Sequence, residues 1–179
     1  MFRFPAILPA ILVLAAVPAS AQHAGHAAPS SAYAGEQQRE IKALAADDQR
    51  AFLSGAGIGF ARAAELNHFP GPMHVVELAD ALALSPEQRQ ASAQLLQEHK
   101  AEARELGARV VAAERELDRL FAGGSVDAAA LAAAVAKAGE ALAAYRLAHL
   151  DAHRRQRALL TAEQVREYDR RRGYAAGGQ

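Results

Sequence analysis

Residues 84–88 read Leu-Ser-Pro-Glu-Gln, and residues 160–164 read Leu-Thr-Ala-Glu-Gln. In each segment the serine or threonine can accept a hydrogen bond from a backbone N–H of the first helical turn, while the glutamine three positions later can reach back to the cap. The proline in the first segment suits a first helical turn, where its missing N–H is not needed. Both segments therefore predict helix N-termini. The capping residues are Ser85, Gln88, Thr161 and Gln164.

Two long helical patterns lie between these segments, because apolar residues recur there at steps of three and four. Residues 122–125, Ala-Gly-Gly-Ser, separate the two patterns, since paired glycines commonly end one helix before another begins. Each helix of about 35 residues would be about 50 Å long, and we expect the two to fold back as an antiparallel hairpin. A final helix from Ala162 to Arg172 should turn across the open end. The residues expected on the inner apolar stripes are Leu95, Leu96, Leu106, Val110, Leu117, Leu120 and Phe121 in the first helix, and Leu131, Val135, Leu142, Tyr145, Leu150 and Leu159 in the second.

Shorter elements are expected before the hairpin. Residues 36–53 fit an amphipathic helix, and three glycines between positions 55 and 59 then make a permissive segment. A short helical piece ends at the Pro-Gly-Pro of residues 70–72, and residues 73–83 can form another short helix. The fold class expected is therefore all-α, a long antiparallel helical hairpin with additional shorter helices. The expected domain is a single one over residues 36–174, with N-terminal helices and a Gly/Pro-rich segment at 36–72, the hairpin region at 73–174 and a tail at 175–179.

The beginning of the chain resembles an export signal. Residues 1–21 have a charged start at Arg3, a short apolar run and a closing Ala-Ser-Ala, which together predict a cleavable signal peptide and a periplasmic location. An uncleaved anchor is the alternative, although the run is shorter than the roughly 20 apolar residues of a spanning helix. Residues 22–35 are small and polar and are expected to form a flexible arm, in which His23 and His26 are either solvated or a loose metal-binding tag. No membrane span is expected after cleavage.

Composition excludes several classes of function. The 179 residues include 20 Lys and Arg against 20 Asp and Glu, and loss of Arg3 with the signal would leave a net charge of about −1, so no bulk charge favours nucleic acid. The chain has no cysteine, which excludes thiol catalysis, thiolate metal sites and covalent c-type haem attachment. No zinc-hydrolase or phosphate-binding motif is present. We therefore expect a protein that is not an enzyme and requires no cofactor.

The paired Leu-Ser/Thr-x-x-Gln segments around a helical hairpin resemble the Spy/CpxP family of LTxxQ-motif periplasmic proteins and its neighbours among periplasmic heavy-metal-resistance and metal-sensing proteins. The resemblance covers residues 73–174. It implies a hairpin that often dimerises into a cradle, ATP-independent holding of unfolding envelope proteins, or a metal-responsive stress function that involves a sensor protein. The motif residues carry over as structural helix caps: Leu84, Ser85, Gln88, Leu160, Thr161 and Gln164.

The sharpest candidate for chemistry is His149-Leu150-Asp151-Ala152-His153, in which two imidazoles lie four residues apart on one helical face. If the turn is centred near residue 124, His149 faces His99 across the hairpin, and Arg146 faces Glu102. The residues of a predicted metal site are His99, Glu102, His149 and His153, with zinc, copper, nickel or cobalt as the ion.

Two alternatives to this metal site stay open. The same residues could form a polar layer in the hairpin seam, with Glu102 paired to Arg146. His149 and His153 could instead be exposed, since one residue of drift turns a side chain by about 100° around its helix. A poorer second cluster combines His74 and Glu77 with Glu65 and His68.

Three functions follow as hypotheses. The first is a Spy/CpxP-like protein that binds unfolded or stressed envelope proteins through an apolar hairpin face. The second is a periplasmic metal-binding, metal-resistance or sensor protein that uses the histidine cluster. The third is a purely structural or interaction module.

Overall fold

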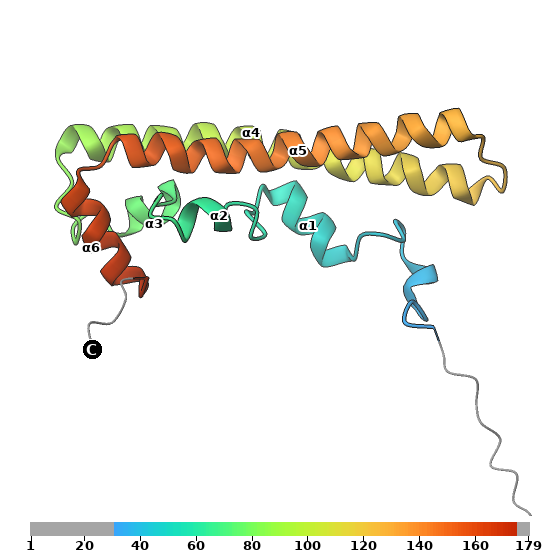
Figure 1. Cartoon of the computed structure of the whole chain (residues 1–179), viewed down its shortest axis with the longest axis horizontal. Coiled ribbons are helices and arrows are strands. Elements are labelled where there is room, and N and C mark those ends of the chain that lie inside the picture. Colours follow the sequence, from blue (N-terminus) through green and yellow to red (C-terminus); the bar gives the residue numbers. More distant parts are fainter. Residues whose placement is uncertain (1–30, 175–179) are drawn as a thin grey trace, which may run out of the picture. The chain divides into compact units, whose positions relative to one another are not determined.

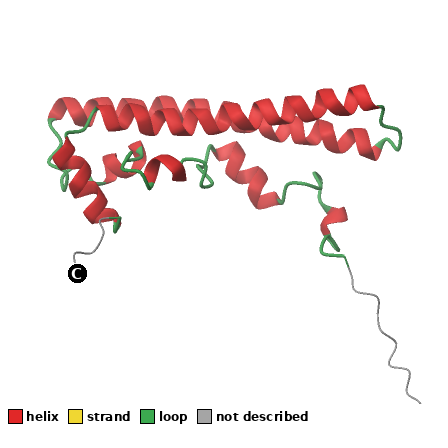
Figure 2. Ribbon diagram, in the orientation of Figure 1, coloured by secondary structure: helices red, strands yellow, loops and turns green. Residues whose placement is uncertain are grey.

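The computed structural model describes residues 31–174, and the regular elements of this part of the chain are all helices (Figures 1 and 2). They are η1 (Glu36–Gln38), α1 (Ala46–Ser54), α2 (Arg62–Glu65), α3 (Pro72–Glu77), α4 (Pro86–Ala122), α5 (Ala128–Ala158) and α6 (Ala162–Arg172). The prediction of an all-α fold is confirmed. The chain divides into two units, Met1–Ala34 and Gly35–Gln179, and of the first unit only residues 31–34 are described. The predicted signal peptide at 1–21, residues 22–30 of the predicted arm and the tail at 175–179 lie outside the described residues.

Within the second unit, α4 and α5 run antiparallel and side by side, with α1, α2 and α3 following one another along them and α6 at the open end (Figure 1). Gly124, with a φ of 73°, lies in the turn between the long helices, where a left-handed backbone favours glycine. Asp127 then caps α5, because its carboxylate accepts the N–H groups of Ala129 and Ala130 at 2.9 Å. Across the hairpin the Gln156 amide donates to Ser92 Oγ at 3.0 Å.

Capping boxes begin both α4 and α6. Ser85 Oγ accepts the N–H of Gln88 at 3.2 Å, and the Gln88 side chain accepts the N–H of Ser85 at 3.0 Å. Thr161 and Gln164 repeat this pair of bonds at 3.2 and 2.9 Å. The leucine that precedes each cap is buried in one apolar cluster at the open end of the hairpin. This cluster comprises Val75, Leu82, Leu84, Leu160, Val165 and Tyr168.

A second apolar cluster lies where α1 crosses the hairpin, and an aromatic trio fills it. The Tyr145 ring centre is 5.1 Å from that of Phe52 and 5.6 Å from that of Phe60. The close approach of α1 depends on Gly107 in α4, because a Cβ at that position would lie 1.9 Å from the backbone oxygen of Phe52. Ile41, Val110 and Val111 complete the cluster.

The predicted helix over residues 36–53 is wrong in its first half. The chain forms η1 and then an isolated bridge between Ile41 and Leu44 before α1 begins at Ala46. The physical reason is that carboxylates accept backbone N–H groups and hold this part in an extended turn: the N–H of Lys42 donates to the Asp118 carboxylate at 3.0 Å, and the N–H of Ala45 donates to Asp48 at 3.1 Å.

The predicted helix over residues 73–83 is too long. α3 ends at Glu77, and turns continue to Ala83, which has a positive φ of 47°. These turns bring Leu82 and Leu84 together into the end cluster. Burial of the two leucines therefore outweighs the helical preference of the segment.

Candidate functional site

Two histidines from the long helices meet inside the hairpin. His99 of α4 and His149 of α5 have ring centres 4.7 Å apart and ring planes at 88°. His149 is only 3% exposed. Its Nδ1–H donates to the Tyr145 carbonyl at 2.9 Å, which leaves a lone pair on Nε2. Both His149 Nε2 and His99 Nδ1 are buried without a hydrogen-bond partner among the described residues.

The surroundings of His99 favour a neutral imidazole. Its pKa is lowered to about 4, mainly by burial and to a smaller extent by the nearby His149 and His153. Burial also lowers the pKa of His153, although the Phe69 carbonyl and the Glu65 carboxylate oppose this shift. At neutral pH His99 therefore retains a lone pair that can accept a hydrogen bond or bind a metal ion.

The glycine-rich segment before α2 covers this pair. A Cβ on Gly57 would lie 3.5 Å from His149 Cδ2 and 3.9 Å from Nε2. The Tyr145 hydroxyl donates to the Ala56 carbonyl and so holds the segment against α5. Burial raises the pKa of this hydroxyl to about 12, so it remains a donor.

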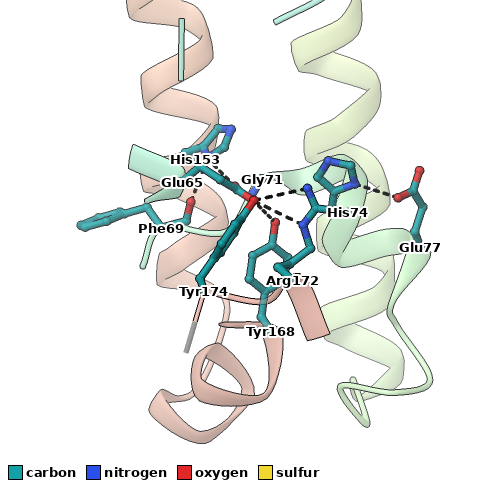
Figure 3. Close-up of polar contacts among 9 residues, drawn as sticks. All are labelled: Glu65, Phe69, Gly71, His74, Glu77, His153, Tyr168, Arg172 and Tyr174. Atoms are coloured by element: carbon teal, nitrogen blue, oxygen red, sulfur yellow. Dashed lines mark hydrogen bonds and ion pairs between the residues drawn. The ribbon is translucent and has the colours of Figure 1, made fainter. Parts of the chain in front are cut away.

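His153 lies in a different cluster, which is centred on the Glu65 carboxylate (Figure 3). Glu65 accepts from the Tyr168 hydroxyl at 2.6 Å and from the Gly71 N–H at 3.2 Å. His153 Nδ1 is 3.5 Å from Glu65 and donates to the Phe69 carbonyl at 2.8 Å. Arg172 Nε is 3.6 Å from the same carboxylate. This single side chain therefore joins α2, the Pro-Gly-Pro loop, α5 and α6.

A cleft of about 410 Å³ opens beside the Glu65 cluster. Its wall combines two arginines and a histidine with apolar side chains from the glycine-rich segment and the end of α6. The lining residues are Gly57, Ile58, Gly59, Ala61, Arg62, Glu65, Leu66, His74, Arg172 and Tyr174. His74 is held by Glu77, to which its Nδ1–H donates at 2.8 Å.

The predicted metal residues thus divide into three places. The structure brings His99 and His149 together, and it places His153 with Glu65. Glu102 and Arg146 are both exposed, so the prediction that they share the hairpin seam is wrong. Within residues 31–174 no three side chains of His, Cys, Asp or Glu are grouped so that they could hold one metal ion.

The poorer predicted cluster is also split. His74 pairs with Glu77, whereas the Nδ1–H of His68 donates to Asp169 on α6 at 2.7 Å. The sequence patterns did not predict that Glu65 lies at the centre of a polar cluster, or that Tyr168 and Arg172 contact it. The available signal was the carboxylate of Glu65, five residues before Pro-Gly-Pro. The prolines prevent regular backbone pairing in this loop, so its remaining N–H groups need side-chain acceptors.

A different surface lies along α5, on the side opposite its packed face. We call it the outer stripe, and it comprises the exposed residues Ala128, Ala132, Val135, Ala136, Gly139, Leu142, Ala143 and Leu147. Val135 is 53% exposed, Leu142 38% and Leu147 66%. The prediction that Val135 and Leu142 lie on the inner stripe is wrong, because α5 packs through alanines at 134, 138, 148 and 152 together with Tyr145.

Among the described residues, α5 is the one helix that is long and apolar enough to cross a membrane. Only 11% of its apolar stretch of 18 residues is buried. Comparisons of the chain with family models, curated proteins and solved structures found no match.

Proposed function

We propose that this chain is a Spy/CpxP-like protein of the bacterial periplasm that binds unfolded envelope proteins, without ATP, on the outer stripe of α5. The observation that carries the proposal is the exposure of Val135, Leu142 and Leu147 on one helical face that no described element covers. Contiguous apolar surface that stays in water commonly marks an interaction site. The Spy/CpxP resemblance of the hairpin region supports the same function.

The chemistry of the stripe suits unfolded chains better than one folded partner. Most of its members are alanine or glycine, so it offers a smooth surface without deep side-chain pockets. Burial of apolar area contributes roughly 25 cal/mol per Å² regardless of sequence. Lys137 and Glu140 lie beside the stripe, and Arg146 lies on it, one turn after Leu142 and Ala143; these charges of both signs favour no particular client charge. Binding of this kind is weak per contact and tolerant of sequence.

The length of the outer stripe also fits the binding of an extended client segment. Residues 128–147 span about 29 Å of helix, which matches roughly nine residues of extended chain. A client segment of that length can lie along the stripe while the packed face of α5 remains on α4.

The test is suppression of aggregation of a reduced, unfolding model protein by residues 22–179, without nucleotide. Val135→Glu with Leu147→Glu should abolish the protection, because two charges interrupt the stripe. Leu53→Glu is the matched control, since Leu53 is 50% exposed on α1, outside the stripe. The proposal would be overturned if the parent protein, the Val135→Glu/Leu147→Glu variant and the Leu53→Glu variant suppressed aggregation equally.

Two other occupants of the stripe are distinguished by parallel measurements. Sedimentation of the protein alone would reveal a dimer that the double variant dissociates. Flotation with anionic lipid vesicles would reveal membrane binding. Either result without client protection would reject client binding as the function of this face.

Export is tested separately. The protein recovered from the periplasmic fraction should begin at Gln22. A mature chain that retains Met1 would contradict the cleaved signal.

A further inference from the structure

The two unpartnered nitrogens in the hairpin require an explanation. Buried polar atoms in folded proteins almost always have a hydrogen-bond partner, and exceptions often mark an ion, a water molecule or a functional group. Here His99 Nδ1 and His149 Nε2 come from facing helices and are both without a partner among the described residues. Their rings are also neighbours, with centres 4.7 Å apart.

The spacing of the rings is compatible with one shared metal ion. An ion in line with one nitrogen of each ring, at a bond length of about 2.0–2.1 Å, would lie about 3.2 Å from both ring centres, and centres 4.7 Å apart would then subtend about 95° at it. Neighbouring ligands in tetragonal nitrogen and oxygen sites are close to this angle, and such sites favour divalent copper. A linear two-coordinate ion would need the rings much farther apart.

The hydrogen bond from His149 Nδ1–H to the Tyr145 carbonyl supports the same assignment. Metal-binding histidines usually donate their other N–H to a carbonyl or carboxylate, which fixes the ring and raises the basicity of the free nitrogen. Gly57 leaves room on the Nε2 side, because a side chain there would enter the space next to that nitrogen.

We propose that His99 Nδ1 and His149 Nε2 together bind one divalent late transition-metal ion, with copper preferred and water completing the coordination. The site is independent of the outer stripe and therefore goes beyond the proposed client binding. Copper should bind more tightly than zinc, as expected for nitrogen ligands in the Irving–Williams order.

The experiment is calorimetric titration of residues 22–179 with Cu²⁺ and Zn²⁺, in a His23→Ala/His26→Ala background that removes the histidines of the arm. His149→Phe and His99→Phe should each weaken Cu²⁺ binding by about a hundredfold or more, since loss of even a supporting residue costs about 10–100-fold. His68→Ala is the matched control, because its imidazole is bound to Asp169 and it should leave Cu²⁺ binding unchanged.

A second readout separates ligand loss from misfolding. The electron paramagnetic resonance spectrum of the Cu²⁺ complex should show coupling to two imidazole nitrogens, and to one nitrogen in either single variant. Gly57→Ala, which places its Cβ at ordinary contact distance from His149, should fold normally and weaken binding. The proposal is overturned by the absence of Cu²⁺ binding, by binding that survives both phenylalanine variants, or by a one-nitrogen spectrum in the parent protein.

Discussion

Gln88 and Gln164 exchange a reciprocal pair of hydrogen bonds, in which the Nε2 of each donates to the Oε1 of the other at 2.9 Å. Each Nε2 also donates to a backbone carbonyl of the opposite segment, that of Leu159 at 2.8 Å or that of Leu82 at 3.3 Å. Each Oε1 accepts the N–H of its own cap residue as well. The two capping boxes therefore form one structural unit that closes the open end of the hairpin.

We expect the two glutamines to be energetically coupled. Gln88→Ala and Gln164→Ala should each lower the free energy of unfolding by about 1–3 kcal/mol, because each leaves half-buried backbone and amide groups without partners. The double variant should lose less than the sum, with a coupling of about 0.5–3 kcal/mol. Urea denaturation of the four proteins measures this cycle. Gln94→Ala is the control, since the Gln94 side chain donates a hydrogen bond to the exposed Glu98. Additive losses in the Gln88 and Gln164 cycle would contradict a shared unit.

The starts of α4 and α6 could be predicted because a capping box is local in sequence: Ser85 and Gln88 lie three residues apart. The approach of His99 to His149 also followed from a local feature, the position of the glycine turn. Contacts between segments 76 residues apart, such as that of Gln88 with Gln164, have no such local signal.

The packed face of α5 could not be predicted from large apolar residues. Its seam uses alanines, such as Ala138 and Ala152, which let the helices approach closely, and the larger Val135 and Leu142 remain outside. Periodicity identifies a stripe only when the largest side chains are the buried ones. The central place of Glu65 was similarly hidden, because its partners come from three separate segments.

Glu65 should be the most sensitive carboxylate of the described residues. Glu65→Ala is expected to lower the free energy of unfolding by about 3–5 kcal/mol, since it leaves the Tyr168 hydroxyl, the Gly71 N–H and Arg172 without their acceptor in a mostly buried site. Chemical denaturation followed by circular dichroism measures the loss. Glu77→Ala, at an exposed pair with His74, is the control and should cost less than about 1 kcal/mol. Similar losses in the two variants would reject the central role of Glu65.

Gly107 and Gly139 provide an internal comparison of two helical glycines. Gly107→Ala should destabilise the protein by several kcal/mol or detach α1, because its Cβ would collide with the backbone of Phe52. Gly139→Ala has no atom within 4 Å of the added Cβ and should stabilise by about 0.5–1 kcal/mol through helix propensity. Thermal unfolding ranks the two variants, and amide exchange in α1 shows whether that helix is released. Protection of α1 that is unchanged in a fully stable Gly107→Ala protein would contradict the packing.

Acid should weaken the fold over the pH range in which His99 is protonated in the unfolded chain and neutral in the folded protein. The pKa of His99 is about 4 in the folded protein, below its ordinary value of 6.5, so the unfolded chain takes up the proton first as pH falls. The stability associated with neutral His99 is therefore complete above pH 6.5 and declines between pH 6.5 and 4. His153 acts in the same direction, because burial also lowers its pKa.

Denaturation midpoints measured from pH 7.5 to 4.5 test this window. The midpoint of the parent protein should fall across it, and that of His99→Phe should fall less, because the variant has no imidazole to protonate at this position. Glu87, Glu98 and Glu167 have pKa values lowered by hydrogen bonds from Ser85, Arg155 and Arg171, so their contributions are lost only at more acidic pH. Parallel curves for the parent and the variant above pH 4.5 would show that His99 is not the group that titrates.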